Sequence, residues 1–138
     1  LETDLVFVPS VNEMYPDEDR QIFDLGGLDK VMEGEHREGH FKGVAQIVSK
    51  LFLVVRPTRA YFGQKDFQQL VIIRRLVEIL GLNITIIPCP IIREKDGLAM
   101  SSRNVYLSPA ERQHAVILST AIKKAESRHE HYYSLPGY

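Results

Sequence analysis

Two short polar segments of this chain carry residue types that can bind phosphate. The first is Gly63–Asp66 (GQKD), and the second is Ser101–Arg103 (SSR), which follows an Asp96-Gly97 turn. A lysine can contact a phosphate, and an arginine remains charged and can neutralise charge that develops on a triphosphate. Serine hydroxyls add hydrogen-bond donors, and a loop of small residues is easily reshaped around a ligand. Together the two segments indicate adenylate chemistry.

Each segment also has an ordinary structural interpretation. Gly63–Asp66 could be only the cap of a following helix with Lys65 in solvent, which is the favoured interpretation of the tetrapeptide alone. Ser101–Arg103 could be common polar residues after a turn. Two such segments after successive strands favour a phosphate site, because open α/β sheets bind ligands beyond the carboxyl ends of their strands. Gln68 and Gln69 could face the same crevice and bind a hydroxy acid, although helix surfaces often carry glutamine.

The sequence contains little that indicates a metal site or a catalytic nucleophile. His36 and His40 have the spacing of two metal ligands on one helix face, but Gly39 interrupts the segment, so we expect no metal site. Arg37 could be a further cation for a phosphate or a carboxylate. The sequence has no Walker-type glycine loop and no Gly-x-Ser-x-Gly motif, and we expect Cys89 to be structural.

The composition is that of an ordinary globular domain. The 138 residues are 44% hydrophobic and include 17 basic against 18 acidic residues, which gives a formal net charge of −1. This balance provides no electrostatic argument for nucleic acid or a membrane surface as a partner. A single cysteine cannot form an internal disulfide, so we expect a reducing, cytoplasmic location. No apolar run approaches transmembrane length.

Strand-like and helix-like segments alternate along the chain. Short apolar runs predict strands at residues 4–9, 59–62 and 83–87, with a further possible strand at 21–25. Apolar residues at three- and four-residue steps predict helices at residues 41–57, after Gly63 up to Gly81, and from Pro109 to about Lys124, with a brief helix at 28–32. Ser108 and Glu111 have the spacing of a capping box. The alternation predicts an α/β fold with a parallel sheet flanked by helices.

Four stretches resemble one enzyme family, the pantothenate synthetases or pantoate–β-alanine ligases. They are DLVFVPSVNEMYP, VMEGEHREGHFKGVAQIVSKLF, RAYFGQKDFQQL and IIREKDGLAMSSRNVYLSPAER, and they cover most of residues 4–112 in the family's order. The last two are highly specific to the family. The resemblance implies a Rossmann-like catalytic domain similar to that of class I aminoacyl-tRNA synthetases and other nucleotidyltransferases, a homodimer, and a C-terminal lid domain.

The resemblance also implies a two-step reaction that consumes ATP. The pantoate carboxylate attacks the α-phosphate of ATP to give pantoyl adenylate and pyrophosphate, and the amine of β-alanine then attacks the acyl carbon to give pantothenate and AMP. Because the carboxylate is itself the nucleophile, catalysis depends on alignment and on neutralising phosphate charge. The family implies Mg²⁺ as well, without identifiable ligands in this sequence.

The family's site residues carry over to both polar segments and to positions near them. Lys65 and Arg103 would contact the phosphates, and Ile92 would meet the adenine through its backbone. Gln69 would bind pantoate, and Arg37 would lie near the substrates. The implied ATP-binding residues are Gly63, Gln64, Lys65, Asp66, Ile92, Met100, Ser101, Ser102 and Arg103, of which Lys65, Ser101, Ser102 and Arg103 are the expected catalytic residues.

The sequence departs from the family at one matched position and in two parts that it lacks, one of which is most of the C-terminal lid domain. Gln64 stands where the family usually has Glu, and the family's N-terminal His-x-Gly-His segment is absent, since His36–His40 is not its equivalent. The chain also begins without methionine. We therefore expect residues 1–126 to be the second half of the catalytic domain and residues 127–138 to be a tail. We expect the chain alone to have little or no ligase activity, although its parent protein would have it.

Two other functions fit the same pattern. One is a different nucleotidyltransferase of this fold, which would transfer AMP or CMP to another acceptor. The other is a non-catalytic module that binds a nucleotide or forms a dimer. Dependence of ATP–pyrophosphate exchange on pantoate separates the ligase from the first alternative, and ATP binding without exchange would favour the second.

Overall fold

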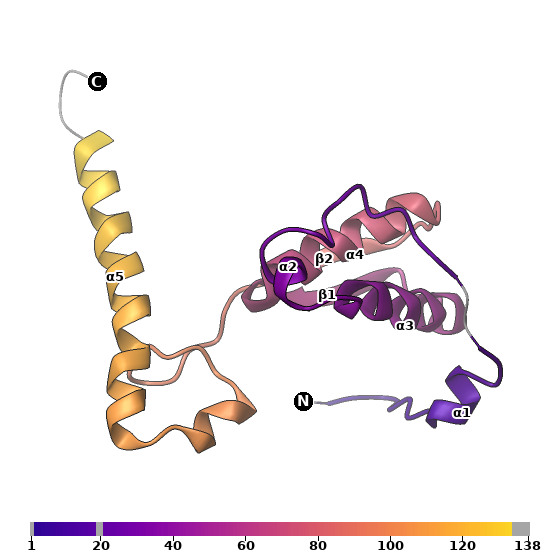
Figure 1. The fold of residues 1–138 in the computed structure, drawn as a ribbon, viewed down its shortest axis with the longest axis horizontal. Coiled ribbons are helices and arrows are strands. Elements are labelled where there is room, and N and C mark those ends of the chain that lie inside the picture. Colours follow the sequence, from indigo (N-terminus) through magenta and orange to yellow (C-terminus); the bar gives the residue numbers. More distant parts are fainter. Residues whose placement is uncertain (1, 19–20, 134–138) are drawn as a thin grey trace. The chain divides into compact units, whose positions relative to one another are not determined.

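The chain consists of two compact units, Leu1–Cys89 and Pro90–Tyr138. A computed structural model describes residues 2–18 and 21–133, and Figure 1 shows the order of their helices and strands. In chain order the elements are α1 (Val11–Met14), α2 (Glu33–His36), α3 (His40–Val55), β1 (Arg59–Gly63), the 3₁₀ helix η1 (Gln64–Asp66), α4 (Phe67–Ile79), β2 (Thr85–Cys89), the 3₁₀ helix η2 (Ser102–Tyr106) and α5 (Pro109–Tyr133).

A parallel pair of strands organises the first unit. β1 and β2 pair from Arg59 opposite Thr85 to Gly63 opposite Cys89, which confirms the predicted α/β class with a parallel sheet. Parallel strands need a crossover connection, and η1 and α4 supply it here. β2 begins later than the predicted strand and continues through Pro88. Proline has no N–H to donate and is tolerated at a sheet edge, and among the described residues β2 pairs only with β1.

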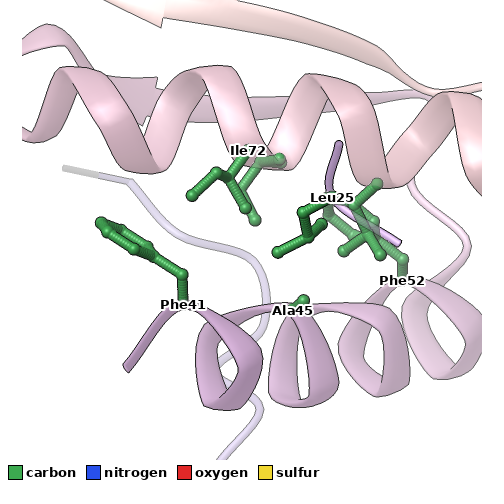
Figure 2. Close-up of a cluster of buried hydrophobic side chains, with 7 residues drawn as sticks. Leu25, Phe41, Ala45, Phe52 and Ile72 are labelled. Atoms are coloured by element: carbon green, nitrogen blue, oxygen red, sulfur yellow. The ribbon is translucent and has the colours of Figure 1, made fainter. Parts of the chain in front are cut away.

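The core of the first unit lies where α3 and α4 face each other (Figure 2). Ile72, Ile73 and Leu76 of α4 are completely buried there. Ala60 and Phe62 of β1 pack against this cluster, whereas Tyr61 between them is 64% exposed, as the alternation of side chains along a strand requires. The cluster consists of Leu25, Phe41, Ala45, Phe52, Ile72, Ile73 and Leu76.

The buried face of α3 differs slightly from the predicted one. Val55 is one of the apolar residues at three- and four-residue steps that predicted a buried face for the helix at residues 41–57, but it is 54% exposed. Ser49 is completely buried, and its hydroxyl donates a hydrogen bond to the carbonyl of Gln46 at 2.8 Å, so its burial leaves no unpaired hydroxyl. The buried residues of α3 are Phe41, Ala45, Ser49 and Phe52.

The N-terminal segments do not form the predicted strands. Residues 4–9 and 21–25 have no strand structure, and Val6 and Ile22 are 73% and 81% exposed, although Leu25 is buried in the core. A strand needs a neighbour to satisfy its backbone N–H and C=O groups, and the described part of the chain offers these segments none. The brief helix predicted at residues 28–32 is also wrong in position, because α2 begins only at Glu33.

The long helix α5 begins as predicted and continues further than predicted. The Ser108 hydroxyl donates to the Glu111 carboxylate at 2.7 Å and accepts from the Glu111 N–H at 3.4 Å, which confirms the capping box. The helix was expected to end near Lys124 but continues to Tyr133, because neither Gly nor Pro occurs between these positions. The rest of the predicted tail, 134–138, lies outside the described residues. No helix in the described ranges is long and apolar enough to cross a membrane.

Truncating Ile72 to alanine should test the packing of α4. Ile72 is completely buried, so Ile72→Ala should lower the free energy of unfolding of the first unit by about 2–5 kcal/mol. Ile79 lies on the same helix and is 38% exposed, so Ile79→Ala should cost about 1 kcal/mol or less. Urea unfolding measures both, and equal losses would contradict the buried face described for α4.

Candidate functional site

A polar pocket lies in the first unit where β1 leads into α4. We call it the strand-end pocket. Lys65, Asp66, Gln69 and Arg37, four of the predicted site residues, all line it. Its volume of about 140 Å³ leaves room for several water molecules or a small polar ligand. The structure therefore brings together side chains of opposite charge and an amide in one pocket.

The turn between β1 and α4 places Lys65 and Asp66 at this pocket. β1 ends at Gly63, and η1 carries Lys65 and Asp66 to the first residue of α4. Ligands of open α/β sheets bind at this position, near the positive end of the helix dipole. Asp66 occupies the N-cap position of α4, but its side chain makes no cap hydrogen bond. The helix-cap interpretation therefore does not account for this carboxylate.

Gln68 holds one wall of the strand-end pocket in place. Its Nε2 donates to the carbonyls of Leu28 and Val31 at 2.8 and 2.7 Å. Its Oε1 accepts from the Glu33 N–H at 3.1 Å. The sequence suggested that both Gln68 and Gln69 could bind a ligand. The structure distinguishes their roles. The amide of Gln68 forms hydrogen bonds with the backbone of residues 28–33, whereas Gln69 forms no such bonds among the described residues.

Arg37 reaches the strand-end pocket beside an acidic neighbour. Its Nη1 lies 3.3 Å from Oε2 of Glu33, and the two side chains are 51% and 67% exposed. Exposed ion pairs contribute little stability, so Arg37 can exchange this partner for a ligand anion at small cost. Glu33 also lines the pocket and was not predicted. Its only sequence signal is an acidic residue four positions before an arginine.

The two histidines with metal-ligand spacing lie on different helices. His36 ends α2 and His40 begins α3, so the shared helix face that the spacing suggested does not exist. His40 instead contacts the ring of Phe41, with 4.9 Å between the ring centroids. Within the described ranges no group of three His, Cys, Asp or Glu side chains could hold a metal ion.

The second unit contains the Ser101–Arg103 segment. The hydroxyl of Ser101 accepts a hydrogen bond from the Arg103 N–H at 3.2 Å. The guanidinium of Arg103 is exposed and has no ion-pair partner in the described part of the chain. Just before this segment, the Met100 N–H donates to the Ile92 carbonyl at 2.9 Å. The segment thus presents a cation at the end of a hydrogen-bonded turn.

Four polar side chains connect the turn at residues 94–97, before this segment, to η2 and α5. We call them the Arg112 cluster: Glu94, Asp96, Asn104 and Arg112. Arg112 contacts Glu94 at 2.5 Å and Asp96 at 2.7 Å. Asn104 donates to Glu94 at 2.5 Å. Hydrogen bonds from Asn104 and Arg112 lower the pKa of Glu94, and a hydrogen bond from Arg112 lowers the pKa of Asp96. None of these four residues was predicted, because their contacts join separate elements.

The predicted site residues fall into the two units. The strand-end pocket is lined by Lys65, Asp66, Gln69 and Arg37. Gly63 and Gln64 are the two residues before Lys65 in the sequence. The residues of the second unit are Ile92, Met100, Ser101, Ser102 and Arg103.

The strand-end pocket and the parallel sheet define an α/β domain of the ligand-binding type that nucleotide-dependent enzymes share. The family model for pantoate-beta-alanine ligase matches residues 1–135. The chain belongs to this family.

Similar proteins agree with this assignment. The chain is 64% identical to a pantothenate synthetase of Porphyromonas gingivalis over 107 residues, which cover 78% of the chain and 38% of that protein. It is 58% identical to a pantothenate synthetase of Acetivibrio thermocellus over 123 residues, which cover 89% of the chain and 44% of that protein. The chain thus spans well under half the length of these relatives.

Solved structures show the same relation. A pantothenate synthetase from Thermus thermophilus superposes with a TM-score of 0.78 and 52% identity, over 86% of this chain and 43% of that one. A pantoate-beta-alanine ligase from Francisella tularensis, complexed with beta-gamma ATP and beta-alanine, superposes with a TM-score of 0.71 and 33% identity, over 81% of this chain and 43% of that one.

Removing the amide of Gln68 should loosen the pocket wall. Gln68→Leu leaves the Leu28 and Val31 carbonyls and the Glu33 N–H without their partner, so it should cost about 1–3 kcal/mol. Amide hydrogen exchange should accelerate at residues 28–33 more than in the α4 core. Gln113→Leu, at an exposed glutamine of α5, is the matched control. Unchanged exchange at residues 28–33 would refute this role of Gln68.

The stability that the Arg112 cluster contributes should decrease at low pH. Both carboxyl pKa values are lowered from their ordinary values of 4.5 for Glu94 and 3.8 for Asp96. The cluster therefore stabilises the fold at pH values above these and loses this contribution as the pH falls through the lowered pKa values. Carboxyl ¹³C shifts should titrate with midpoints below 4.5 and 3.8, and Arg112→Gln should raise both. Midpoints at or above the ordinary values would contradict the cluster.

Proposed function

We propose that this chain is part of an AMP-forming ligase that joins pantoate to β-alanine through a pantoyl adenylate and consumes ATP as its third substrate. The observation that carries the proposal is the convergence of Lys65, Asp66, Gln69 and Arg37 on the strand-end pocket. Family membership supports it, as does the Francisella tularensis relative, which was crystallised with beta-gamma ATP and beta-alanine. Mg²⁺ is expected to accompany ATP, and the parent protein is proposed to be a cytoplasmic homodimer.

The residues of the first unit would bind both substrates of the first step. Lys65 would neutralise phosphate charge, and Asp66 would accept hydrogen bonds from a ligand hydroxyl or amine. Gln69 can offer its amide to the hydroxyl and carboxylate of pantoate, and Arg37 can pair with that carboxylate. A side chain at Gly63 would meet no atom within 4 Å, so the backbone there is open to close approach by a phosphate. Gln64 follows it and would add a backbone contact.

The residues of the second unit would act on the nucleotide. Ser101 and Ser102 can donate hydroxyl hydrogen bonds to phosphate oxygens, and Arg103 can stabilise charge that develops on the leaving pyrophosphate. The carbonyl of Ile92 accepts the hydrogen bond from the Met100 N–H, and the N–H of Ile92 would remain for the adenine ring. Met100, which is 57% exposed, would pack on the nucleotide beside it.

The chemistry requires alignment and not a protein nucleophile. The carboxylate of pantoate is already ionised at neutral pH, so it can attack the α-phosphate without a general base. Holding the two reactants in line removes much of the entropic barrier. Positive charge from Lys65 and Arg103 would then stabilise the transition state. An acyl adenylate hydrolyses readily, so a loop such as Ser101–Arg103 would also serve to exclude water until β-alanine arrives.

In the parent protein, Lys65→Ala should lower pantoate-dependent ATP–pyrophosphate exchange by about 10²–10³, the typical cost of removing a donor that stabilises transition-state charge. Lys42→Ala, at an exposed lysine of α3 outside the pocket, should leave the exchange rate unchanged. Exchange that proceeds equally well without pantoate would overturn the ligase in favour of another nucleotidyltransferase.

The isolated chain should release little or no pyrophosphate from ATP, pantoate and β-alanine, because it spans only 38–44% of its relatives' length. A coupled pyrophosphate assay measures this directly, with a complete relative as the positive control. Robust turnover by the chain alone would contradict this expectation. Calorimetry with ATP adds a further comparison, since tight ATP binding by a parent protein that shows no exchange would indicate a non-catalytic nucleotide-binding module.

A further inference from the structure

We propose that Arg112 is a positioning residue for the Ser101–Arg103 segment: by holding Glu94 and Asp96 together, it fixes the segment in the conformation that receives the phosphates. This inference rests on the proposed function, which gives the segment its ligand. Arg112 lies outside the segment, in the first turns of α5. Its effect on the nucleotide would therefore be indirect.

A chain of short hydrogen bonds leads from Arg112 to the segment. Arg112 Nη2 contacts Glu94 Oε2 at 2.5 Å, and the other oxygen of the same carboxylate accepts from Asn104 Nδ2 at 2.5 Å. Asn104 follows Arg103 directly, and its backbone N–H donates to the carbonyl of Ser101 at 3.1 Å. The position of Asn104, which follows the segment and holds the carbonyl of Ser101, therefore depends on Glu94.

The second carboxylate fixes the turn that precedes the segment. Arg112 Nε contacts Asp96 Oδ2 at 2.7 Å, and Asp96 Oδ1 accepts from the Leu98 N–H at 3.1 Å. Gly97 has φ +91, and a Cβ built there would lie 3.3 Å from the hydroxyl oxygen of Ser119 on α5. The turn thus packs closely on the helix, and any larger residue at position 97 would be both strained and crowded.

The geometry requires an arginine at position 112. A guanidinium offers several N–H groups in a fixed plane and can contact two carboxylates at once, whereas a lysine ammonium is a single point of charge. The side chains of Arg112, Glu94 and Asp96 are 33%, 29% and 35% exposed. Without Arg112, two carboxylates would remain close to the segment and would compete with phosphate for its cation, Arg103. Arg112 therefore both shapes the segment and keeps Arg103 available to the ligand.

Hydrogen exchange on the chain without nucleotide tests the positioning role by itself. Arg112→Gln should accelerate amide exchange at residues 98–104 by about fivefold to tenfold, allowing for screening of partly exposed charges. Arg112→Lys should restore part of the protection, and Arg128→Gln, at an exposed arginine of the same helix, should change nothing. Unchanged exchange at residues 98–104 in Arg112→Gln would overturn the proposal. Equal acceleration along all of α5 would also overturn it, because Arg112 would then only stabilise the unit as a whole.

Titration with ATP then tests the link to the ligand. ATP should shift the amide resonances of Ser101–Arg103 in the wild-type chain, and Arg112→Gln should weaken the apparent affinity about fivefold to tenfold, with partial recovery in Arg112→Lys. Equal affinities would overturn the positioning role for the nucleotide. An absence of shifts in the wild-type chain would instead refute the nucleotide-binding role of the segment, and the exchange comparison would still decide whether Arg112 positions it.

Discussion

The parallel direction of β1 and β2 is the constraint on which the first unit depends. Two parallel neighbours cannot be joined by a tight turn, so the chain must cross back through α4. The same helix that makes this connection buries Ile72, Ile73 and Leu76 against α3. Its first turn necessarily lies beside the end of β1, where Lys65 and Asp66 are found. The helix whose burial stabilises the core therefore also places Lys65 and Asp66 at the pocket.

Side chains of the same type differ in this molecule in whether they form hydrogen bonds within the fold. Gln68 and Gln69 are neighbours on α4, but the first binds the backbone of residues 28–33 and the second lines the pocket without such bonds. Arginines divide in the same way. Arg112 is engaged by two carboxylates, whereas Arg103 has an exposed guanidinium. In each pair, the first side chain forms hydrogen bonds within the fold, and the second forms no such bonds among the described residues.

The features predicted from sequence are those that neighbouring residues determine. The ranges of α3 and α4 follow from apolar periodicity, and the start of α5 follows from the Ser108 and Glu111 capping box. The strands expected at residues 4–9 and 21–25 failed because pairing depends on a partner elsewhere in the protein. The contacts of Gln68 to Leu28 and of Arg112 to Glu94 span 40 and 18 positions. No local pattern encodes such contacts, although the polar segments that they support were recognisable.

The unpaired apolar run near the N-terminus has a consequence for how the isolated chain behaves. Leu5, Val6 and Val8 are 81%, 73% and 80% exposed in an extended segment whose backbone groups have no sheet partner in the described residues. Such a segment is a template for intermolecular β-pairing, and Pro9 limits it to the residues before it. Self-association through this run would increase with concentration while the α3–α4 core remained intact. Aggregation of the isolated chain would then result from intermolecular pairing of this segment and not from unfolding of the core.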